Sequence, residues 1–122
     1  PGMIVCADPG ANGELIPSTR EYDETVIGIV SGAGGVNPGL TLTQEGSAAD
    51  GQHPVAMVGR VYCWCDASGG EIRPGTLLTT SNTPGHAMKA SDRERAQHAI
   101  VGKALGHLPT GRGLVLVAVT LD

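Results

Sequence analysis

The chain has 122 residues, of which 40% are hydrophobic, 19 are glycine and 8 are proline, and its formal net charge is −4. This composition predicts one turn-rich globular β domain and argues against nucleic acid as a partner, because neutralising phosphates requires a clustered basic surface. Tyr22, Tyr62 and Trp64 are the only aromatic residues, so platforms for stacking bases or sugar rings are scarce. No apolar run reaches the roughly 18 to 20 residues that span a bilayer, and we expect no membrane insertion.

Short strands separated by turns are predicted along the first part of the chain. Apolar runs of strand length lie at 3–6, 14–16, 25–31 and 40–44. Asn12-Gly13 favours a hairpin because both residues accept positive φ at little cost. The small residues at 31–35 predict a loop that ends in the turn Asn37-Pro38-Gly39, and the polar stretch 45–53 predicts a surface excursion.

The second part of the chain contains the longest predicted strand, at 55–66, with Gly59 as a bulge or close-approach position. A strand between two Pro-Gly turns follows within 73–89. The Ser-x-x-Glu spacing of Ser91 and Glu94 is that of a capping box, so at most one short helix is predicted, near 91–98. A strand is expected within 99–105. Apolar residues at both the even and the odd positions of 114–121, and so on both faces of a strand, then predict a central last strand, paired on both edges.

Four glycine-containing motifs recur in the same order about 73 positions apart. The pairs are Pro1-Gly2 with Pro74-Gly75, Gly13 with Gly85, Ile27-Gly28 with Val101-Gly102, and Gly39-Leu40-Thr41-Leu42 with Gly113-Leu114-Val115-Leu116. One interpretation is an internal duplication with halves at about 1–45 and 74–122; the alternative is chance in a glycine-rich chain. We predict a single all-β domain over 1–122, a small barrel or sandwich of roughly eight to ten short strands.

The candidate catalytic residues are Ser81, His86 and Lys89, because a hydroxyl needs an adjacent base to become a nucleophile at neutral pH. Further hydroxyls lie beside them, at Thr79, Thr80 and Thr83. The same residues stabilise turns by hydrogen-bonding the nearby backbone. We favour this structural interpretation and a protein that is not an enzyme.

The candidate metal ligands are Cys6, Cys63 and Cys65. A complete site would take further ligands from the histidines, which are His53, His86, His98 and His107. Zinc ligands usually come in pairs spaced by about two to four residues, whereas Cys-x-Cys in a strand places two thiols on one face as small hydrophobic side chains. We therefore predict no metal and no other cofactor.

Several long motifs resemble a β domain found in the C-terminal parts of phage tail-fibre-like proteins and large exported bacterial proteins. The motifs cover nearly the whole chain and lie at 22–32, 37–40, 55–61, 72–81, 83–89, 100–105 and 113–117. The resemblance implies a non-enzymatic structural or assembly module that caps or decorates a parent fibre or particle protein. It implies a homo-oligomer, with a trimer as one form, at the virion, in the extracellular space or at the cell surface. It brings no catalytic residues.

Two alternatives remain open from the sequence. One is a self-processing, chaperone-type C-terminal domain released from a longer precursor, although no residue match supports the cleavage chemistry. The start at Pro1 fits such release, simple Met removal or an excised fragment equally. The other is a carbohydrate-binding module, against which the scarcity of aromatic residues argues. In every case symmetric association is expected, because small β domains must pair or protect their exposed strand edges.

Overall fold

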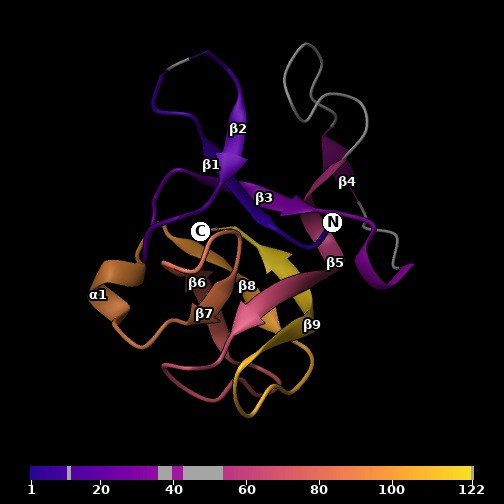
Figure 1. Cartoon of the computed structure of the whole chain (residues 1–122), viewed down its shortest axis with the longest axis vertical. Coiled ribbons are helices and arrows are strands. Elements are labelled where there is room, and N and C mark those ends of the chain that lie inside the picture. The colour runs from indigo at the N-terminus through magenta and orange to yellow at the C-terminus, as the bar shows by residue number, and fades with distance from the viewer. Residues whose placement is uncertain (11, 36–39, 43–53, 122) are drawn as a thin grey trace.

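The computed structural model describes residues 1–10, 12–35, 40–42 and 54–121. Within this part of the chain nine strands join one sheet, together with one short α-helix, α1 (Arg93–Ala96), and a 3-10 turn, η1 (Ala33–Gly35) (Figure 1). The strands are β1 (Ile4–Ala7), β2 (Leu15–Pro17), β3 (Val26–Val30), β4 (Leu40–Leu42), β5 (Val55–Asp66), β6 (Leu77–Thr80), β7 (Ala87–Lys89), β8 (Ile100–Ala104) and β9 (Arg112–Thr120). The predicted all-β fold with one helix near 91–98 is confirmed. No helix among the described residues combines the length and the apolar character needed to cross a bilayer.

Five strands close a small barrel in the order β5-β9-β8-β6-β7, which decides between the predicted barrel and sandwich. β5 and β9 pair antiparallel over nine positions, from Val58 opposite Thr120 to Asp66 opposite Arg112. The barrel closes where β7 pairs in parallel with β5, at Cys65 opposite Ala87. β9 lies between β5 and β8, so the prediction of a central last strand is confirmed.

The barrel core is aliphatic, as expected for a chain without Phe. Alternate residues of β5 and β9 point inward and are buried, and the set consists of Val61, Cys63, Cys65, Val115, Val117 and Val119. Each buried valine contributes roughly 1.5–3 kcal/mol relative to an exposed one. The row of buried, inward-facing residues along β5 ends at Gly59, which has φ +92°. Gly59 pairs with Val119 without a register shift, so the predicted bulge is absent from the β5–β9 ladder.

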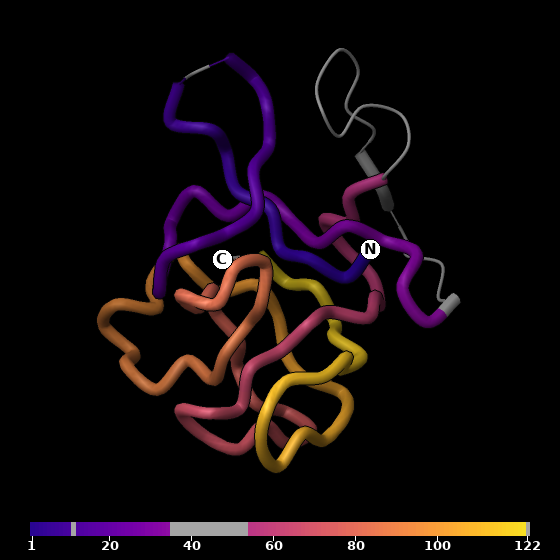
Figure 2. Tube along the Cα trace, in the orientation of Figure 1, coloured from indigo at the N-terminus to yellow at the C-terminus, as the bar shows by residue number. Residues whose placement is uncertain are grey.

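The remaining strands extend the sheet from the N-terminal part of β5. The order is β2-β1-β3-β5, and β4 pairs with the same part of β5. Figure 2 shows this extension above the barrel, with the N-terminus between the two. One strand, β5, thus belongs to both parts of the fold.

The strands β1, β2 and β3 repeat the pairing of β6, β7 and β8. Ala7 lies opposite Leu15 in the first hairpin, as Thr80 lies opposite Ala87 in the second. The third strand of each unit pairs with a register shift at the same place, between Val5 and Cys6 and between Leu78 and Thr79. The two units therefore share strand order, direction and register. The division of the chain into halves at about 1–45 and 74–122 stays a prediction.

Gly28 and Gly102 occupy equivalent positions in these two units. A Cβ on Gly28 would lie 2.4 Å from the main-chain oxygen of Ala56, and one on Gly102 would lie 2.2 Å from that of Ala118. Both glycines let two strands approach closely. The fourth sequence match differs, because β4 pairs with β5 alone among the described strands, whereas β9 pairs with β5 and β8.

The predicted capping box is wrong by one residue. Asp92, not Ser91, is the N-cap, and its Oδ1 accepts hydrogen bonds from the main-chain nitrogens of Glu94 and Arg95, both at 3.1 Å. A carboxylate at this position satisfies two helix N–H groups and lies at the positive end of the helix. The predicted turn Asn37-Pro38-Gly39 and the predicted excursion at 45–53 lie outside the described residues.

Candidate functional site

The predicted hydroxyl cluster lies on β6 and just after it, and three of its hydroxyls hydrogen-bond the backbone, those of Thr79, Thr80 and Ser81. Thr79 and Thr80 are fully buried and Ser81 is 3% exposed. Thr79 Oγ1 donates to the main-chain oxygen of Ala99 at 2.6 Å. Ser81 Oγ donates to the main-chain oxygen of His86 at 2.8 Å. The Ser81 bond fixes the corner between β6 and β7, and the Thr79 bond ties β6 to the residue before β8.

Thr80 connects the barrel to the segment before β3. Its Oγ1 donates to the main-chain oxygen of Arg20 at 2.7 Å and accepts from the main-chain nitrogen of Asp23 at 2.8 Å. The main-chain nitrogen of Tyr22 donates to the main-chain oxygen of Thr80 at 3.3 Å. One buried hydroxyl therefore satisfies a donor and an acceptor on a distant segment.

The Asp66 carboxylate also binds the corner between β6 and β7. Thr83 Oγ1 donates to Asp66 Oδ2 at 2.7 Å, and the main-chain nitrogen of Ser68 donates to Oδ1 at 2.9 Å. Hydrogen bonds from Ser68 and then Thr83, with a smaller effect of the Arg112 charge, lower the pKa of Asp66 to about 2. The carboxylate is therefore ionised at neutral pH and serves to anchor the turn.

The remaining catalytic candidates do not form a nucleophile–base pair with Ser81. The His86 ring has its Nδ1 2.8 Å from the main-chain oxygen of Pro84, and its centroid lies 5.7 Å from that of Trp64. Ser81 contacts the main-chain oxygen of His86 rather than the ring. Lys89 lies exposed at the end of β7. The structure brings Ser81 and His86 together as turn residues.

The cysteines are buried thiols in two parts of the fold. Cys63 Sγ donates to the main-chain oxygen of Trp64 at 3.2 Å, and Cys65 Sγ donates to that of Cys63 at 3.5 Å. The hydrogen bond with Cys65, followed by burial, raises the pKa of Cys63 well above its ordinary value. Cys6, in β1, has a pKa raised to about 11 by burial and then by the nearby Asp23 charge. Both effects disfavour the thiolate that binds metals.

No group of three or more potential ligands converges on one point within the described ranges. His107 Nε2 lies 2.5 Å from Glu71 Oε2, and His98 follows α1 with φ +65°. His53 lies outside the described residues. The three cysteines and these histidines therefore supply no observed metal geometry.

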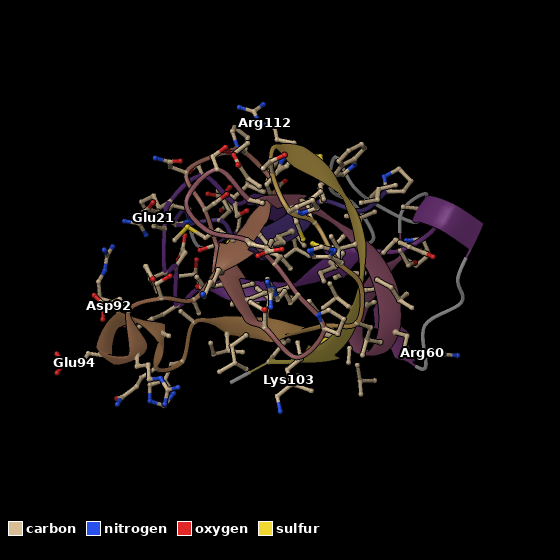
Figure 3. The ribbon with its side chains drawn as sticks, turned by 90° about the horizontal axis from the view of Figure 1, so that it is seen from below. Glu21, Arg60, Asp92, Glu94, Lys103 and Arg112 are labelled. Atoms are coloured by element: carbon tan, nitrogen blue, oxygen red, sulfur yellow. The ribbon has the colours of Figure 1, made fainter. Side chains whose placement is uncertain are left out.

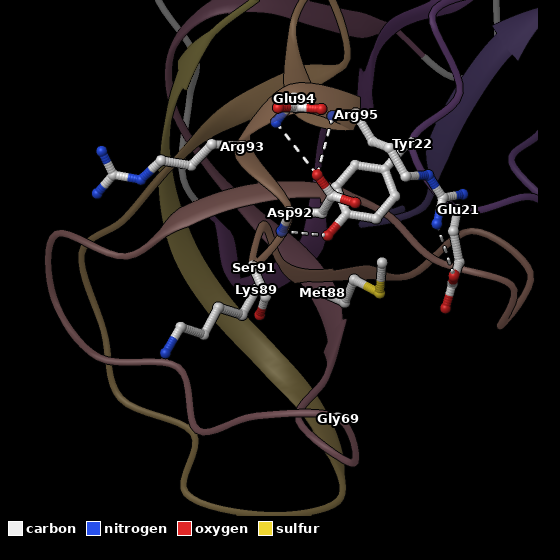
Figure 4. A pocket seen from close by; sticks show the side chains of 10 residues that line it. All are labelled: Glu21, Tyr22, Gly69, Met88, Lys89, Ser91, Asp92, Arg93, Glu94 and Arg95. Carbon is white, nitrogen blue, oxygen red and sulfur yellow. Dashed lines mark hydrogen bonds and ion pairs between the residues drawn. The ribbon is translucent and has the colours of Figure 1, made fainter.

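The side of the domain near α1 carries an open groove in which Glu21, Tyr22, Asp92 and Arg95 interact with one another (Figure 4). Tyr22, with φ +54°, accepts a hydrogen bond at its hydroxyl from the main-chain nitrogen of Asp92 at 2.9 Å. The Arg95 guanidinium lies 4.5 Å from the Tyr22 ring centroid and 4.0 Å from Glu21 Oε1. An exposed cation–π contact contributes roughly 0.5–1 kcal/mol. These contacts tie α1 to the segment before β3.

A second surface lies on the outside of the barrel, where outward side chains of β5, β9 and the end of β8 are apolar. We call it the outer apolar face, and it consists of Tyr62, Trp64, Leu105, Leu114 and Leu116. Tyr62 lies opposite Leu116 and Trp64 opposite Leu114, while the main-chain nitrogen of Leu105 donates to the oxygen of Leu116 at 2.7 Å. Leu105 is 43% exposed and Leu114 is 40% exposed.

Two glycines cover the aromatic margin of this face. A Cβ on Gly34 would lie 2.5 Å from the Tyr62 ring, and one on Gly2 would lie 3.0 Å from Trp64 Cδ1. Leu105 and Leu114 remain open to solvent. Sequence reasoning missed this face because apolar residues on both parities of 114–121 also indicate a strand covered on both sides.

Comparison of the chain with protein-family models, with curated proteins and with solved structures gives no match.

Proposed function

We propose that this domain is a non-enzymatic structural module that assembles through its outer apolar face. The observation that carries the proposal is the pair of exposed leucines on the outside of the barrel, Leu114 on β9 and Leu105 directly after β8. Exposed apolar residues that are contiguous and rimmed by polar groups are typical of protein–protein interfaces.

The charged residues around this face support an interface of this kind. Arg60 and Lys103 lie exposed on the next row of the sheet, each opposite Ala118, and Arg112 begins β9. Their side chains extend from the body of the domain in Figure 3. A centre without charge and a charged rim is the usual anatomy of an association surface.

The chemistry of the β6–β7 corner supports a structural role. Its hydroxyls donate to main-chain or carboxylate oxygens, as Thr80 does to Arg20 and Thr83 does to Asp66. A nucleophile instead needs a hydroxyl directed at a base that accepts its proton.

The setting of the proposed assembly comes from the motif resemblance. A domain that caps or decorates a phage-tail-fibre-like or exported bacterial protein would lie at the virion or the cell surface. Its partners would be copies of itself, with a trimer as the proposed form, and the parent fibre or particle protein. An apolar face on a barrel suits such symmetric packing, because it buries side chains without rearranging the strands.

Light scattering of the purified chain tests the proposal. We expect the wild type to self-associate and the double variant Leu105→Asp/Leu114→Asp to be monomeric, because two carboxylates cannot be buried unpaired in an interface. The matched control adds the same charge at two exposed residues that are not part of the face, Thr19→Asp/Gln97→Asp, and should associate like the wild type. A wild type that stays monomeric at high concentration would refute the proposal.

A further inference from the structure

The repeated three-stranded units differ in what covers their outer edge. In the second unit, β7 has β6 on one side and β5 on the other, where Ala87 pairs in parallel with Cys65. Ala87 and Cys65 are both fully buried. The contact between β7 and the covering strand is one bridge long.

Leu15 takes the place of Ala87 in the first unit. Ala7 faces Leu15 as Thr80 faces Ala87. The next hydrogen bond along each hairpin is also repeated, from the main-chain nitrogen of Ser18 to the oxygen of Ile4 at 3.0 Å and from that of Ala90 to the oxygen of Leu77 at 2.9 Å. Among the described strands, β1 alone pairs with β2, so β2 is an edge strand (Figure 1).

The backbone of Leu15 points away from β1. The main-chain nitrogen of Asp8 donates to the main-chain oxygen of Glu14 at 3.0 Å, and the main-chain nitrogen of Ser18 donates to the main-chain oxygen of Ile4. Because hydrogen-bonded and non-hydrogen-bonded pairs alternate in an antiparallel ladder, Ile16 bonds to β1 and Leu15 presents its N–H and C=O outward. The side chain of Leu15 is half-buried against the small cluster of Val5, Val30 and Val55.

We propose that the outer edge of β2 receives one extended strand of a partner protein, parallel to β2, with small apolar side chains at alternate positions. The inference is based on the proposed function as an assembly module, and it names a second surface of that module. The internal repeat supplies the template, because β5 presents Val61, Cys63 and Cys65 to the barrel interior beside β7. Strand addition to an open sheet edge is an established way for proteins to bind extended segments.

The donor strand is assigned to another protein because a second copy cannot offer its own β5. In each copy the C-terminal part of β5 is already held by β9 on one edge. On its other edge it is held by Ala87 and by the hydrogen bond from the main-chain nitrogen of Trp64 to the oxygen of Gly2 at 2.8 Å. A second copy would have to open its barrel to donate this strand.

Pro17 limits the proposed binding site for the partner strand to the Leu15 end of β2. Pro17 occupies the position that Lys89 has in β7, and it lacks the N–H that a longer ladder would use. The expected contact is therefore a short parallel bridge centred on Leu15, as short as the bridge between Cys65 and Ala87.

The probe is a fluorescent peptide with the sequence of residues 60–66, carrying alanine in place of Cys63 and Cys65. Anisotropy titration of the full chain should give saturable binding, and amide chemical shifts should change along β2. Leu15→Pro removes the outward N–H without touching the β1 ladder and should weaken binding about tenfold or more. Pro17→Ala adds an outward N–H and should strengthen binding.

Three further samples make the test decisive. Leu15→Glu keeps the outward N–H but places a charge beside the apolar side chains of the partner strand, so it should weaken binding. This variant tests the proposal even if Leu15→Pro does not fold. A scrambled peptide should not bind, and Leu105→Asp should bind like the wild type, which separates this edge from the outer apolar face. Absence of binding, or equal binding by the Leu15 variants, would overturn the proposal. Wild-type dimers that Leu15→Pro abolishes would overturn the foreign strand as the occupant.

Discussion

Replacing Thr80 with valine should destabilise the domain, because one buried hydroxyl satisfies two backbone groups of another segment. Valine has the shape of threonine, so packing is kept. The main-chain nitrogen of Asp23 loses its acceptor at 2.8 Å, and the main-chain oxygen of Arg20 loses its donor at 2.7 Å. The two backbone groups lie 57 and 60 positions from Thr80 in sequence, so no local rearrangement replaces the hydroxyl.

The expected loss follows from the burial of the two groups. An unsatisfied buried N–H costs about 1–3 kcal/mol, and a partly buried C=O that regains water costs about 0.5–1.5 kcal/mol. The free energy of unfolding should fall by about 2–4 kcal/mol, which lowers the urea midpoint by about 1–2 M at an unchanged slope.

Urea unfolding followed by tryptophan fluorescence at Trp64 measures this change. Thr120→Val is the matched control, because Thr120 is exposed at the end of β9 and its replacement should change stability by less than about 0.5 kcal/mol. Equal midpoints for the two variants would refute the role of Thr80 as a connection between the barrel and the segment before β3.

Two other predictions concern the same corner. Asp66 has a folded pKa of about 2, below its ordinary 3.8, so its ionised form stabilises the fold by about 2 kcal/mol above about pH 4, and this contribution is lost as the pH falls towards 2. Urea unfolding of Asp66→Asn should show lower stability at pH 7 and a smaller loss between about pH 4 and pH 2; a pH dependence like that of the wild type would contradict the assignment. Ser81→Ala and His86→Ala, placed in a precursor extended at its N-terminus, should leave the precursor mass unchanged relative to the unmutated precursor, and a variant-specific loss of processing would restore the catalytic hypothesis.

Local patterns predicted most of the strands. The strand at 55–66 has the predicted bounds, because its apolar run is ended by turn residues on both sides. The helix was predicted at the right place but with Ser91 as its cap; Asp92 replaces it because its carboxylate reaches two helix N–H groups at once. Competition between adjacent capping residues depends on the entry angle of the chain, which spacing alone does not reveal.

The surfaces could not be predicted because they depend on long-range pairing. Apolar residues at both Leu114 and Val115 indicate a strand covered on two faces, whereas only the side of Val115 is buried in the monomer. Predicting the open edge at Leu15 requires the knowledge that β5 passes from one part of the sheet to the other. Its equivalence to Ala87 becomes visible only in the strand register.

The central claim is that the barrel assembles through its outer apolar face. Light scattering coupled to size-exclusion chromatography, over a range of concentrations, measures the mass of the particle directly. We predict a multiple of 12.4 kDa for the wild type and 12.4 kDa for Leu105→Asp/Leu114→Asp. The same mass for both proteins, whether monomeric or assembled, would contradict the claim.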